Sequence, residues 1–168
     1  MKFATVLLVI ASALVFSVAG LSASFAGLAG LVMALRRGSE LRPIDRLRLR
    51  QMVEFSFANV LLAIAVIPLA TGLGASGAIQ VDAVAIGGFA IVSNTVFARR
   101  TRRLGLPFRG WWARIALGYS VINVLLAAFV AISPRLDAFE ALLAMLLIRP
   151  MLPFLLVLQS WDAEPPAE

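Results

Sequence analysis

The stretch Phe3–Leu35, FATVLLVIASALVFSVAGLSASFAGLAGLVMAL, runs for 33 residues without a charged side chain. As one helix it would be about 50 Å long at about 1.5 Å per residue, whereas the hydrocarbon core of a bilayer is about 30 Å thick. It therefore predicts one tilted or overhanging membrane-spanning helix. A signal peptide is the alternative interpretation, because Lys2 precedes the apolar run and small residues lie between 19 and 24. Cleavage there would leave Phe25–Leu35, too short to span, so we expect the uncleaved helix.

The rest of the chain has the same character. Of its 168 residues, 61% are hydrophobic and 14% are charged, whereas a soluble domain has about 25% charged residues. Four further apolar runs predict spans at about residues 51–73, 79–97, 112–132 and 136–158, and with the first span, at about 3–35, these make five. We expect an all-α, polytopic transmembrane helix bundle over residues 1–160. Residues 161–168 are acidic and Pro-rich, which predicts a disordered tail.

Two residue types that serve many active sites are missing. The chain contains no Cys and no His, which excludes disulfides, thiolate or histidine metal sites, and Ser-His catalysis. The turn Gly72–Gly77 matches the spacing GxGxxG, but it joins two apolar runs instead of a strand and a helix, so we interpret it as a turn. The sequence predicts no catalytic residue, no cofactor and no metal.

The positive charges predict the topology. Lys and Arg number 15 against 9 acidic residues, and twelve Arg fall in two clusters, within residues 36–50 and 99–114. Positive residues flanking spans remain cytoplasmic, so we expect both clusters to face anionic headgroups there, with the N-terminus outside and the C-terminus inside. This placement argues against nucleic-acid binding. The preference for Arg over Lys, with many Ala and Gly, suggests a GC-rich bacterial genome and hence a bacterial inner (cytoplasmic) membrane.

A short motif occurs twice. The segment Asn59–Ala63, NVLLA, recurs as Asn123–Ala127, at an offset of 64 residues, and Arg50 and Arg114 share that offset. The matches predict a parallel duplication of a two-span unit. Coincidence in a chain rich in Ala, Leu and Val is the alternative.

Five polar residues interrupt the apolar runs in one layer of the cytoplasmic half. Counted from the cytoplasmic ends of the spans at about 1.5 Å per residue, Glu54 lies about 4 Å deep, Asn94 about 7 Å deep, and Asn59, Asn123 and Arg149 about 12–15 Å deep. An unpaired Arg at such depth costs about 2.5 kcal/mol or more. We therefore expect a buried polar cluster of Glu54, Asn59, Asn123 and Arg149 that holds the fifth helix to the bundle.

Three acidic residues fall near the opposite membrane face. They are Asp82, Asp137 and Glu140. A cation-attracting mouth and solvated helix ends explain them equally well.

The first apolar run also carries a face of small residues, including Gly20, Gly27 and Gly30. Small residues let membrane helices approach closely. We expect a non-catalytic structural or accessory subunit that packs on another membrane protein or on itself. A small transporter or channel lined by Asn59, Asn123 and Arg149 is the main alternative. A lipid-acting enzyme is the weakest, because it has only Glu54 well placed.

Overall fold

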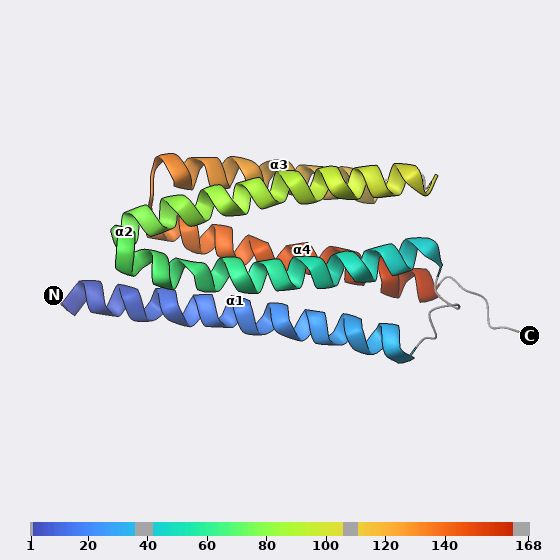
Figure 1. Ribbon diagram of the computed structural model, residues 1–168, viewed down its shortest axis with the longest axis horizontal. Helices are drawn as coiled ribbons and strands as arrows, with labels where there is room; N and C mark the ends of the chain where they lie inside the picture. Colours follow the sequence, from blue (N-terminus) through green and yellow to red (C-terminus); the bar gives the residue numbers. More distant parts are fainter. Residues whose placement is uncertain (1, 36–41, 106–110, 163–168) are drawn as a thin grey trace, which may run out of the picture.

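The chain folds as a bundle of long helices. The computed structural model describes residues 2–35, 42–105 and 111–162. These form α1 (Lys2–Leu35), α2 (Pro43–Arg103), α3 (Trp111–Ile132) and α4 (Leu136–Asp162), which lie side by side along one common direction (Figure 1). Within the described ranges there is no strand, so the expected all-α fold is confirmed.

Helix α2 folds back on itself at Gly74. A straight helix of its 61 residues would be about 90 Å long. Gly74 has φ 73° and ψ 169°, a backbone conformation that is essentially confined to glycine. Residues 43–73 and 75–103 consequently form two antiparallel arms (Figure 1), and the side chains of Glu54 and Arg100 meet across them. The turn expected over Gly72–Gly77 thus reduces to one non-helical residue.

The outer surface of the bundle is apolar. All four helices contain a segment long and apolar enough to cross a membrane. Large hydrophobic side chains point outward on several helices: Phe57, Leu61, Val84, Leu117, Leu125 and Ile132 are each 61–82% exposed. Contact of so much apolar surface with water would be costly, so this surface is suited to lipid. The structure supports a membrane location.

The first arm of α2 begins earlier than the expected span. Pro43 occupies the first turn, where its missing N–H costs no hydrogen bond. Asp45 in the same turn accepts hydrogen bonds from Arg42 and Arg48 at 2.8 and 3.0 Å. The basic segment before residue 51 is therefore helical and continuous with the first arm.

Helix α4 remains one continuous helix although it contains two prolines. It continues through Pro150 and Pro153 and ends at Asp162, so it includes the first two residues of the tail expected at 161–168. The remaining tail residues, 163–168, lie outside the described residues. Proline is tolerated in membrane helices where a neighbouring group satisfies the carbonyl that loses its donor.

The core divides into two hydrophobic clusters. The larger lies toward the Gly74 end and includes Val18 of α1, Ile86 of α2, Val130 of α3 and Leu142 of α4. The smaller, which includes Met52 and Val157, lies at the basic end. Asn59, Asn123 and Arg149 are buried along the same inner faces of the helices.

Candidate functional site: the polar layer around Arg149

Arg149 is a buried cation that is held by neutral groups. Its residue is 4% exposed. One terminal nitrogen, Nη2, donates to Ser93 Oγ at 2.6 Å, to the Ala90 carbonyl at 3.1 Å and to Asn94 Oδ1 at 3.3 Å. The guanidinium carbon also lies 4.6 Å and 5.0 Å from the ring centres of Phe55 and Phe89, within cation–π range.

These contacts connect α4 to the second arm of α2. They come from Ala90, Ser93 and Asn94, not from the two asparagines of the repeated motif. The adjacent polar residues Ser93 and Asn94 in an apolar run were the available sequence signal for these partners. Sequence spacing gives their depth, but not the helix face on which they lie.

Asn59 compensates for a proline. In an α-helix the N–H of residue 150 would donate to the carbonyl of residue 146, but Pro150 has no N–H. The Asn59 side chain, fully buried on the first arm of α2, donates Nδ2–H to the Leu146 carbonyl at 2.7 Å. This bond satisfies a carbonyl that α4 itself leaves free and joins the two helices.

Asn123 is linked to the Met145 carbonyl of α4 through the hydroxyl of Tyr119. The Tyr119 hydroxyl donates a hydrogen bond to the Met145 carbonyl. Asn123 Nδ2 donates to the same hydroxyl at 3.4 Å. Both asparagines of the repeated motif therefore serve consecutive carbonyls of α4, one directly and one through Tyr119.

Glu54 lies apart from this buried group. Its side chain is 41% exposed and accepts hydrogen bonds from Arg50 at 2.8 Å and Arg100 at 2.9 Å. These two arginines belong to different basic clusters, so Glu54 bridges the clusters at one end of the bundle. Of the four predicted site residues, the structure thus buries Asn59, Asn123 and Arg149 and leaves Glu54 at the periphery.

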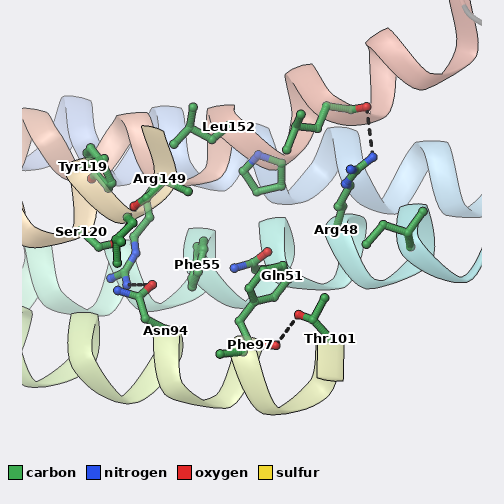
Figure 2. Close-up of a pocket in the computed structure, with 16 residues that line it drawn as sticks. Arg48, Gln51, Phe55, Asn94, Phe97, Thr101, Tyr119, Ser120, Arg149 and Leu152 are labelled. Carbon is green, nitrogen blue, oxygen red and sulfur yellow. Dashed lines mark hydrogen bonds between the residues drawn. The ribbon is translucent and has the colours of Figure 1, made fainter. Parts of the chain in front are cut away.

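A cavity of about 260 Å³ adjoins Arg149. Its walls come from both arms of α2 and from α3 and α4, and Figure 2 shows Arg149 and Asn94 at one end and Arg48 at the other. Gln51, Tyr119 and Ser120 add polar groups to the lining, whereas Asn59 and Asn123 do not line it.

Asp82 is buried without a hydrogen-bond partner. It lies on the inner face of the second arm of α2 and is 1% exposed, and neither carboxylate oxygen has a partner among the described residues. The sequence placed it near the outer membrane face, where a solvated helix end was one explanation. That explanation is wrong, because Ala78, Ile79, Ala83 and Ile86 on the same helix face are buried with it.

Comparison with known proteins identifies no relative. No protein-family model matches the sequence, and neither the curated proteins nor the solved structures contain a significant match. Within the described ranges, no three acidic side chains lie close enough together to hold a metal ion. The function is therefore inferred from the geometry of this chain.

Proposed function

We propose that the protein is a non-catalytic accessory subunit that packs through α1 on a helix of another membrane protein. The observation that carries this proposal is a stripe of small residues that points away from the bundle. Ser17, Gly20, Ser24 and Gly27 recur at three- and four-residue spacing, and all four are exposed. A side-chain carbon added at Gly20 or Gly27 would meet nothing within 4 Å. Such stripes let two membrane helices approach closely.

Two features make this stripe suitable for an apolar partner. The hydroxyls of Ser17 and Ser24 donate to carbonyls of their own helix at 2.8 and 2.9 Å, so they need no outside acceptor. Beside the stripe, Ala23, Ala26 and Gly27 form a cavity with Ser56, Phe57 and Val60 of α2. A neighbouring helix that packs on the stripe would also fill this adjoining recess.

The buried polar layer supports the same proposal. Asn59 and Tyr119 satisfy carbonyls of α4, and Arg149 bonds to the second arm of α2. These side chains are occupied in joining helices. A transport path lined by the two asparagines would need them free to face water.

The proposed arrangement has five crossings of a bacterial inner membrane, with each arm of α2 crossing once. Glu54 connects Arg50 to Arg100, so the described parts of both basic clusters lie at one end of the bundle (Figure 1). Assigning this end to the cytoplasm satisfies the positive-inside rule. The N-terminal end of α1 and the Gly74 turn then lie outside.

Cysteine labelling tests this topology, because the chain contains no cysteine. Single Ser76→Cys and Ser133→Cys proteins should react with a membrane-impermeant maleimide added from the periplasmic side. Arg102→Cys should react only after the membrane is opened. Labelling of Ser76→Cys and Arg102→Cys from the same side would refute the arrangement.

The packing proposal is tested by blocking the stripe. A double variant, Gly20→Leu with Gly27→Leu, should lose a stoichiometric partner during purification in mild detergent, detected by mass spectrometry of the intact complex. Gly118→Leu is the matched control, since Gly118 is an exposed glycine of α3 with the same open space. If the double variant keeps its partner, or if the unmodified protein purifies alone as a monomer, the proposal is wrong. A second copy of the chain as the partner would identify a homo-oligomer.

A further inference from the structure

The carboxylate of Glu54 brings together two arginines from different arms of α2. Its Oε1 accepts hydrogen bonds from Arg50 Nε at 2.8 Å and from Arg100 Nη1 at 3.0 Å. Because both nitrogens contact the same oxygen, they are no farther apart than these two bonds laid end to end. Two guanidinium groups held this close can share one phosphate, whose several oxygens each accept hydrogen bonds.

Both arginines are accessible and keep donors that Glu54 does not use. The side chain of Arg50 is 66% exposed and that of Arg100 is 36% exposed. A guanidinium has five N–H donors. Glu54 engages only Nε of Arg50 and Nη1 of Arg100. Most donors of the two groups are therefore left for a ligand that arrives from outside the bundle.

The surroundings of this pair remain positively charged. Two guanidinium groups share the single carboxylate of Glu54. Arg99, Arg102 and Arg103 lie at the same end of the second arm and are exposed. A surface with such an excess of one charge concentrates ions of the opposite sign. This end of the bundle consequently attracts anions, and the Arg50–Arg100 pair is the point where two cations converge.

Apolar side chains continue the same helix faces away from the basic end. Glu54, Phe57 and Leu61 recur at three- and four-residue spacing, which places them on one face of the first arm. On the second arm, Val92 lies about three helical turns before Arg103 and so shares its face. Phe57, Leu61 and Val92 are each 61–71% exposed. The arginines thus lie at the edge of an apolar outer surface, as a lipid phosphate lies at the end of its acyl chains.

We propose that Arg50 and Arg100 form a binding site for the headgroup phosphate of an anionic phospholipid, whose acyl chains lie on the adjoining apolar surface. A guanidinium binds phosphate oxygens through charge-assisted, often paired hydrogen bonds. Glu54 holds the two guanidinium groups in place. An anionic headgroup is favoured over a zwitterionic one because the nearby arginines repel a headgroup ammonium. The leaflet follows from the proposed topology, whereas the site itself is independent of packing through α1.

Binding is measured by native mass spectrometry of the purified full chain in mild detergent. Phosphatidylglycerol and phosphatidylcholine with the same acyl chains are added in separate titrations, and inorganic phosphate is added as a competitor. We expect one phosphatidylglycerol to bind more tightly than the others and more tightly than phosphatidylcholine, and to remain bound when inorganic phosphate is added at equal concentration. The proposal is overturned if phosphatidylcholine binds as tightly, or if inorganic phosphate displaces the lipid.

Variants assign the binding to the arginine pair. Arg50→Gln and Arg100→Gln should each weaken phosphatidylglycerol binding by about fivefold to tenfold, the effect of one arginine at a charged lipid surface. Arg102→Gln is the matched control, because Arg102 is exposed but lies about 200° around the helix from Arg100. It should bind the lipid almost as the unmodified protein does. An equal loss in all three variants would show diffuse attraction to the basic end and overturn the site.

Two further variants complete the test. If Arg100→Gln fails to fold, the more exposed Arg50→Gln decides the question alone, and unchanged binding in it overturns the proposal. The double variant Gly20→Leu with Gly27→Leu blocks the stripe on α1 but leaves the arginine pair intact. It should bind phosphatidylglycerol as the unmodified protein does, whether or not a partner protein is lost. The lipid site and the packing proposal can thus fail separately.

Discussion

Replacing Asp82 with alanine should stabilise the protein. Its carboxylate oxygens are buried and have no hydrogen-bond partner among the described residues. Removing one unsatisfied buried polar group recovers about 1–3 kcal/mol. The lost atoms leave a void of roughly 20 Å³, which costs about 0.5 kcal/mol at about 24 cal/mol per Å³. The expected net gain in the free energy of unfolding is therefore about 0.5–2.5 kcal/mol.

This gain corresponds to a higher melting temperature. At about 2–4 °C per kcal/mol for a chain of this size, Asp82→Ala should melt about 1–10 °C higher in mild detergent. Melting is followed by loss of the monodisperse peak in size-exclusion chromatography after heating. Asp82→Asn keeps a buried polar group of the same size and should gain less.

A second variant controls for helix propensity. Asp137→Ala makes the same chemical change in a helix, but its side chain is 68% exposed and paired with Arg135 at 2.8 Å. A surface pair of this kind contributes about 1 kcal/mol or less, so this variant should melt close to the unmodified protein. A lower melting temperature for Asp82→Ala, with Asp137→Ala unchanged, would refute the reasoning. It would show that the Asp82 carboxyl has a favourable partner, such as a bound water or ion.

Three further substitutions test the fold and the polar layer, each by the same melting measurement. Gly74→Ala should destabilise the protein by about 1–3 kcal/mol, because φ 73° with ψ 169° is essentially confined to glycine, whereas Gly72→Ala, which has open space, should be neutral or slightly stabilising. Tyr119→Phe keeps the ring but removes the hydroxyl between Asn123 and a carbonyl of α4, and should cost about 1–2 kcal/mol; an unchanged melting temperature would count against a structural role. Glu54→Gln should cost about 1 kcal/mol or less, and this difference should shrink in about 1 M salt, where the Debye length falls to about 3 Å. A difference that does not depend on salt would contradict the assignment of Glu54 as a bridge between the basic clusters.

Much of the architecture could be predicted from the sequence, because it depends on the length, hydropathy and charge of successive segments of the chain. The uncharged run Phe3–Leu35 predicts α1 within one residue at its start. The lengths and hydropathy of the later runs predict helices that suit a bilayer, and the bundle has an apolar outer surface. Arg50 and Arg100, one from each arginine cluster, meet at Glu54 at the same end of the bundle.

The partners of the buried polar side chains depended on tertiary structure. Sequence spacing placed Arg149, Asn59 and Asn123 at one depth, but depth does not fix the direction in which a side chain points. Each helix rotates about its axis until its inner face packs on its neighbours. In the resulting orientation Arg149 donates hydrogen bonds to Ser93 and Asn94. Asn59 faces the carbonyl that Pro150 leaves without a backbone donor. It also buried Asp82, although hydropathy alone placed that residue near a helix end.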